Sequence, residues 1–142
     1  MTASWQFWAL GSAVFAALTA ILAKIGVTGV NPDYATAVRT AVILILVVGI
    51  AGAGGQFAAA GAVSGKAYLF LVLSGLATGA SWLCYFRALG LGDAGRVAPV
   101  DKLSVVLVAL FGTVALGERL GARAWLGILL IFLGVLLVLV DE

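Results

Sequence analysis

Two charged residues, Arg39 and Asp101, lie inside long apolar runs of the sequence, where they could bind a solute or transfer a proton. Each is seven residues inside an expected helix, roughly 10 Å along the axis at about 1.5 Å per residue. A charge at that depth is costly unless it is paired or hydrated, so we expect Arg39 and Asp101 to pair across an internal cavity.

Asp101 is the one carboxylate expected within a membrane span, so it is the candidate for reversible protonation coupled to a solute. The neighbouring Lys102 points about 100° away around the helix, and its charge favours the ionised form of Asp101. The alternative is a permanently ionised Asp101 that only neutralises Arg39. Lys24 and Arg87 are expected in the same third of the membrane, with their charges reaching to its surface.

Pro99 is expected inside the same helix as Asp101 and cannot donate a hydrogen bond to the carbonyl of Gly95. This predicts a helix kink and a free carbonyl near Asp101. Interrupted helices beside charged groups are where many transporters bind their solutes, although proline in membrane helices also serves packing alone.

A polar stripe is expected along the helix over 66–90, where Ser74, Thr78, Ser81 and Tyr85 recur with helical spacing and Trp82 flanks them. The stripe could line a solute path, with Trp82 and Tyr85 as stacking surfaces. It could equally provide hydrogen bonds between helices.

The elements that position these residues are membrane-spanning helices. Of the 142 residues, 64% are apolar and 10% are charged, whereas a soluble domain carries about a quarter charged residues. A span needs about 20 mostly apolar residues, and the runs are too long and continuous for membrane β-strands. We therefore predict an all-α, polytopic membrane helix bundle of about five transmembrane helices, in a single domain over residues 1–142. The expected helices cover about 5–26, 32–54, 66–90, 94–116 and 121–140, and the segment 55–65 is the longest loop.

Several function classes are excluded by composition. The sequence has no histidine and one cysteine, Cys84, so it cannot build a Cys/His zinc cluster or a His-based triad. We expect neither a metal nor another cofactor, and no enzymatic activity. The net charge of +2 is small and the basic residues are scattered, which argues against nucleic acid as a partner.

Topology and assembly follow from the number of spans. An odd number puts the two termini on opposite faces of the membrane, and the basic residues near the loops are balanced between the faces, so insertion in both orientations stays open. The first helix has no basic N-terminal flank and is interpreted as a retained span rather than a signal peptide. Gly127 and Gly134 share one face of the last helix and would let a second subunit approach closely.

A family resemblance spans nearly the whole chain. It is carried by Lys24, Arg39, Arg87-Ala88-Leu89, Ala98-Pro99-Val100, Leu116-Gly117-Glu118-Arg119-Leu120 and the segment 127–134. In this order and spacing, these residues resemble the EamA domain of the drug/metabolite transporter superfamily. The resemblance implies export of small metabolites across the bacterial inner membrane by two such domains arranged as an inverted repeat. The chain resembles one half of that arrangement, and its first helix lacks the glutamate that small multidrug transporters use.

The functional prediction is thus a small-metabolite transporter, an exporter of the inner membrane, that works as a dimer. The simplest dimer is an antiparallel homodimer, and a heterodimer with a similar five-span protein is the other possibility. The internal excess of basic residues favours an anionic or zwitterionic solute. The alternative function is a non-transporting accessory subunit, or half of a heteromeric lipid-carrier flippase whose basic layer meets lipid phosphates.

Overall fold

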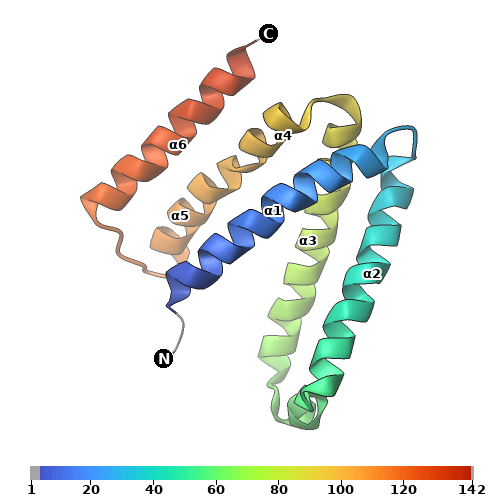
Figure 1. Ribbon diagram of the computed structural model, residues 1–142. Helices are drawn as coiled ribbons and strands as arrows, with labels where there is room; N and C mark the ends of the chain where they lie inside the picture. Colours follow the sequence, from blue (N-terminus) through green and yellow to red (C-terminus); the bar gives the residue numbers. More distant parts are fainter. Residues whose placement is uncertain (1–3, 142) are drawn as a thin grey trace. The chain divides into compact units, whose positions relative to one another are not determined.

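The computed structural model describes residues 4–141, and every regular element in that range is helical (Figure 1). Five helical segments are long and apolar enough to cross a membrane. They are α1 (Trp5–Val27), α2 (Pro32–Ala53), α3 (Gly65–Leu91), the segment Ala94–Ala115 and α6 (Ala122–Val140). The predicted fold class, a polytopic membrane helix bundle, is confirmed. Each of the five segments begins and ends within about one residue of its predicted bounds.

The fourth span consists of two helices, α4 (Ala94–Asp101) and α5 (Leu103–Ala115). The interruption falls at Lys102, three residues after Pro99, where the Lys102 N–H bonds to the Pro99 carbonyl at 3.0 Å in a tighter turn. The Ser104 hydroxyl donates to the Asp101 carbonyl at 2.8 Å. A proline lacks the N–H that would continue the helical ladder, and the local hydrogen bonds are rearranged just beyond it.

The segment predicted as the longest loop is a 3-10 helix instead, η1 (Gln56–Ala62). Gly55 precedes it with φ +65°, a left-handed conformation that glycine adopts without a steric penalty. The Tyr68 hydroxyl donates to the Ala60 carbonyl at 3.2 Å and ties η1 to the start of α3. These local contacts order a segment whose Gly and Ala content indicated a loop.

The chain divides into two compact units. Unit 1 comprises Met1–Ile21 and Gly92–Glu142, and unit 2 comprises Leu22–Leu91. In unit 2, α2 and α3 pack side by side and η1 contacts α2 (Figure 1). In unit 1, α6 packs against both α4 and α5. The prediction of a single domain stays a prediction.

The start of α2 is fixed by its own sequence. Asn31 caps the helix because its side-chain oxygen accepts hydrogen bonds from the N–H groups of Asp33 and Tyr34, at 2.9 and 3.2 Å. Pro32 occupies the first helical turn, where its missing N–H costs nothing. A cap of this kind stabilises a helix by about 1 kcal/mol. The cap therefore sets where Asp33, Thr36 and Arg39 lie along α2.

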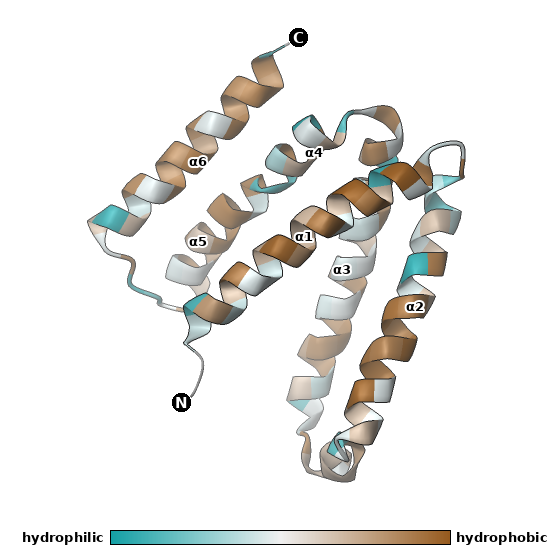
Figure 2. Cartoon of the chain, in the orientation of Figure 1, coloured by the Kyte–Doolittle hydropathy of each residue, from teal (hydrophilic) through white to brown (hydrophobic). Residues whose placement is uncertain are grey.

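The helices expose apolar side chains along most of their length, and hydrophilic residues gather near helix ends and connections (Figure 2). The exposed residues include Trp5, Trp8, Ile45, Leu71 and Leu130. Water would disfavour such a surface, whereas lipid chains solvate it. The bilayer is therefore the partner of this surface.

Candidate functional site

The Arg39 side chain lies over two aromatic rings of α3. Its Cζ atom is 4.3 Å from the centroid of the Trp82 ring and 5.4 Å from that of Phe86. Trp82 and Phe86 are four residues apart and so occupy one face of α3. Phe86 is buried, and Arg39 and Trp82 are half-buried. The helix pair thus holds a guanidinium against an aromatic surface, an arrangement that stabilises the cation by about 0.5–2 kcal/mol depending on its hydration.

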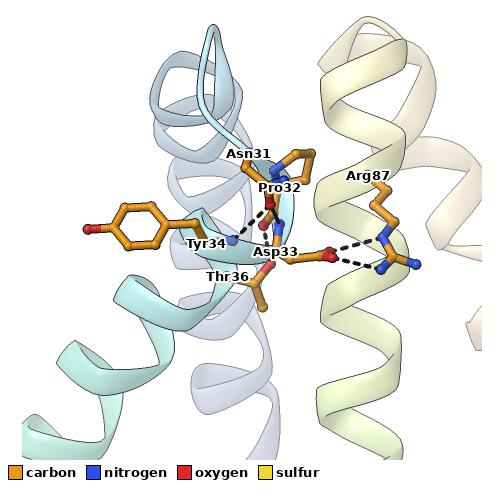
Figure 3. Close-up of polar contacts among 6 residues, drawn as sticks. All are labelled: Asn31, Pro32, Asp33, Tyr34, Thr36 and Arg87. Atoms are coloured by element: carbon orange, nitrogen blue, oxygen red, sulfur yellow. Dashed lines mark hydrogen bonds and ion pairs between the residues drawn. The ribbon is translucent and has the colours of Figure 1, made fainter.

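Asp33 and Arg87 join the start of α2 to the last turns of α3 (Figure 3). The Arg87 Nε donates to Asp33 Oδ1 at 3.0 Å and Nη2 donates to Oδ2 at 2.9 Å. The Asp33 side chain is 50% exposed and the Arg87 side chain is 59% exposed. The planar guanidinium matches both carboxylate oxygens, which gives the contact a defined geometry as well as charge complementarity.

Lys24 brings the end of α1 to the same place. Its Nζ donates to the carbonyl of Leu89, a fully buried residue near the end of α3, at 2.8 Å. A Cβ atom added at Gly90 would lie 3.4 Å from Pro32 Cγ, so α3 ends close against the start of α2. Three helix ends of unit 2 therefore meet in one polar cluster, made of Lys24, Asp33, Arg87 and the Leu89 carbonyl.

This cluster extends the sequence interpretation of Lys24 and Arg87. We expected both charges to reach to the membrane surface, and the fold also supplies each with a protein partner. Asp33 was missed as a functional candidate. Its place in the first turn of a helix that begins with proline could have drawn attention to it, but nothing in the sequence pairs it with Arg87.

Asp101 contacts its neighbour in the chain. Lys102 Nζ donates to Asp101 Oδ2 at 3.1 Å, and both residues lie at the interruption between α4 and α5. Arg39 belongs to unit 2 and Asp101 to unit 1. The pairing of Arg39 with Asp101 stays a prediction.

The residues of the polar stripe of α3 differ in their exposure to solvent. Ser74, Thr78 and Ser81 are exposed, whereas Tyr85 and the flanking Trp82 are half-buried. The Thr78 hydroxyl donates to the Ser74 carbonyl at 2.9 Å, within its own helix. Within residues 22–91, the hydroxyls of Ser74 and Ser81 have no hydrogen-bond partner. The stripe therefore offers polar groups on a face that unit 2 leaves uncovered.

The two glycines of α6 have room beside them. A Cβ atom added at Gly127 or at Gly134 would meet no atom within 4 Å, and the same holds for Gly75 and Gly79 of α3. Among the described residues, neither pair is used for close packing within its own unit. A neighbouring subunit could approach either surface, and the dimer contact at Gly127 and Gly134 stays a prediction.

Among residues 4–141, no three His, Cys, Asp or Glu side chains gather where they could hold a metal ion. Cys84 is exposed and has no disulfide partner in that range. The candidate site in unit 2 consists of one arginine against aromatic rings, one cluster at three helix ends and the exposed hydroxyls of Ser74, Thr78 and Ser81.

Comparison with known proteins identifies the family of the chain. The model of the EamA-like transporter family matches residues 3–140. The chain is 59% identical over 140 residues to a protein from Sinorhizobium sp. named "Uncharacterized transporter in cobO 3'region", and the match covers 99% of each chain. No solved structure matches. The chain therefore belongs to the EamA-like transporter family, and it is a multi-pass membrane protein with a transporter role.

Proposed function

We propose that the chain is the subunit of a small-metabolite exporter of the bacterial inner membrane, and that two five-span subunits form the transport unit. The observation that carries this proposal is the α3 surface with Arg39 against Trp82 and the exposed hydroxyls of Ser74 and Ser81. Polar groups that face lipid are unfavourable. In a membrane, this surface is therefore expected to contact another protein segment or a hydrated path.

A second copy of the chain is the simplest cover. Five spans place the termini of one subunit on opposite faces, and two antiparallel subunits would reproduce an inverted repeat with a binding region between them. The open space beside Gly127 and Gly134 supports a contact along α6. The Sinorhizobium relative has nearly the same length, which supports five spans as a recurring unit, and its bacterial source supports the inner membrane.

Within this function, we propose roles for two groups of candidate residues. The first group is Arg39, Trp82, Tyr85, Ser74, Thr78 and Ser81, which would line the solute path. The second group is Asp101 and Lys102 at the α4–α5 interruption, which follows Pro99. There Asp101 could couple a proton or neutralise Arg39. The proposed role is binding and translocation, with no covalent step.

Topology and activity test the proposal together. In a Cys84→Ala background, Ser4→Cys and Asp141→Cys should react with a membrane-impermeant maleimide on opposite faces, and both orientations should occur in one population if the dimer is antiparallel. Purified protein should also release selected solutes from vesicles loaded with a bacterial metabolite extract, as measured by mass spectrometry. Both termini on one face would contradict the topology. Release no faster than from protein-free vesicles would contradict transport by the chain alone and favour an accessory or heteromeric role.

A further inference from the structure

We propose that Arg39 is the anion-binding residue of this transporter and that the transported class is small organic carboxylates. This inference rests on the proposed function, because it names the substrate of the same α2–α3 surface. It goes beyond the charge balance of the sequence by assigning recognition to one guanidinium and its positioning to two aromatic side chains.

The aromatic contacts leave the hydrogen-bonding edge of Arg39 available. Trp82 and Phe86 bear on the guanidinium at ring-centroid distances of 4.3 and 5.4 Å. Neither contact uses an oxygen acceptor, so the rings hold the cation without pairing its five N–H donors with oxygen atoms. Within unit 2, no oxygen atom accepts a hydrogen bond from Arg39, and no carboxylate forms an ion pair with it. Within unit 2, the side chain is thus held in place and its donors have no acceptor.

The other basic groups at this end of unit 2 are already engaged. Arg87 uses two of its donors on the two oxygens of Asp33, and Lys24 donates to the Leu89 carbonyl. The neighbouring hydroxyls of α2 are engaged as well, because Thr36 donates to Pro32 and Thr40 to Thr36, each to a backbone carbonyl at 2.8 Å. Anion recognition on this surface therefore falls to Arg39.

The guanidinium fork and its single charge together favour a carboxylate as the ligand group. A guanidinium fork matches a carboxylate through two parallel hydrogen bonds, as the Arg87–Asp33 pair of the same unit illustrates. Arginine stays charged at any physiological pH, so this site attracts anions and repels ammonium groups throughout. A phosphate monoester carries about two negative charges near neutral pH and would be matched less completely by a single guanidinium.

Trp82 offers a direct reporter of binding. The sequence has four tryptophans, and replacing Trp5, Trp8 and Trp125 by Phe leaves Trp82 as the only one. In this background, an anion that draws on the Arg39 fork should change the emission of the ring beneath the guanidinium. The purified protein in detergent would be titrated at constant ionic strength with butyrate, butylammonium, butanol and methyl phosphate, none of which absorbs at the excitation wavelength of tryptophan.

We expect a saturable change with butyrate and none with butylammonium or butanol. Arg39→Gln should remove the response, and Arg39→Lys should weaken it at least tenfold because it keeps the charge but loses the planar fork. Phe86→Leu should weaken it less. Arg96→Gln is the matched control, since it removes one positive charge outside unit 2 and should leave the butyrate response unchanged.

An unchanged butyrate response in Arg39→Gln, equal responses to butyrate and butylammonium, or no saturable response to butyrate would each overturn the inference. Tighter binding of methyl phosphate than of butyrate would overturn the carboxylate assignment. The proposed function fails separately. Arg39-dependent butyrate binding by a protein that moves no solute across vesicles would contradict transport alone, whereas solute movement unaffected by Arg39→Gln would contradict this inference alone.

Discussion

Arg87 of α3 holds both carboxylate oxygens of Asp33 of α2, at 3.0 and 2.9 Å, although the two residues are 54 positions apart in the chain. The pair closes the polar cluster at three helix ends, where Lys24 also reaches the Leu89 carbonyl. It fixes the end of one span against the start of another. The spacing of Arg39 from Trp82 and Phe86 depends on that registration, because all of these residues lie on the same two helices.

The first prediction concerns this ion pair. Asp33→Asn and Arg87→Gln should each lower the melting temperature of the protein in mild detergent by a few degrees, since either change leaves one charge without its partner. The reversed pair, Asp33→Arg with Arg87→Asp, should recover part of the loss. Asp93→Asn, in the connection between α3 and α4, is the control and should leave the melting temperature unchanged. If the double variant Asp33→Asn with Arg87→Gln loses as much stability as the two single variants together, the pair contributes no coupling energy.

The second prediction concerns the turn after α5. Gly117 has φ +69°, and its neighbours on both sides, Leu116 and Glu118, donate their N–H groups to the Gly112 carbonyl at 3.2 and 3.0 Å. Gly117→Ala should destabilise the protein by about 1 kcal/mol, because a Cβ atom disfavours a left-handed backbone.

Gly121→Ala serves as its control, since Gly121 has an ordinary extended backbone and open space at the Cβ position. Reversible unfolding in detergent compares the two variants. Equal stability of Gly117→Ala and Gly121→Ala would show that the turn relaxes without cost.

The third prediction concerns the charge pair that the sequence suggests. If Asp101 neutralises Arg39, then Asp101→Asn leaves a poorly compensated charge, with a cost of up to about 3–5 kcal/mol in a dry site and less where water enters. Adding Arg39→Gln should then restore part of the stability. Lys102→Gln is the control, because Lys102 contacts the same carboxylate at 3.1 Å. A double variant as unstable as the sum of its parts would rule out coupling between Arg39 and Asp101.

The fourth prediction concerns the subunit contact. Replacing Gly127 and Gly134 together by Leu should separate the subunits in mild detergent, since the larger side chains fill the space that a partner helix needs. Size-exclusion chromatography with light scattering gives the mass directly. Gly49→Leu in α2 is the control and should leave the dimer intact. A dimer that persists in the double variant but is lost when Gly75 and Gly79 become Leu would move the contact to α3.

The five spans were predictable because a membrane helix needs an apolar run of sufficient length, and charged or turn residues mark its ends. Its depth in an apolar run placed Arg39 among the candidates, and the helical spacing of the neighbouring hydroxyls placed Trp82 there. Neither pattern brought the two residues together, because hydropathy gives no register between two neighbouring helices. The contact between Arg39 and Trp82 depends on the packing of α2 against α3, which is a tertiary property.

Local chemistry was only partly readable. Pro99 predicted a disturbance of its helix, but its position alone could not show that the interruption falls at Lys102, where new hydrogen bonds compete with the helical ladder. The segment 55–65 looked like a loop because it is rich in Gly and Ala, and a contact from Tyr68 outside the segment helps to order η1. Asp33 was overlooked since its partner lies in another helix.

Transport of small carboxylates by means of Arg39 is tested most directly by one vesicle assay. Purified protein is reconstituted in vesicles loaded with succinate, glutamate, choline and spermidine, all of which cross lipid slowly, and the loss of each is followed by mass spectrometry. We predict severalfold faster loss of a carboxylate than from protein-free vesicles, no gain for the cations, abolition by Arg39→Gln and retention in Arg96→Gln. Equal loss from vesicles with and without protein, or loss that Arg39→Gln leaves unchanged, would contradict the account.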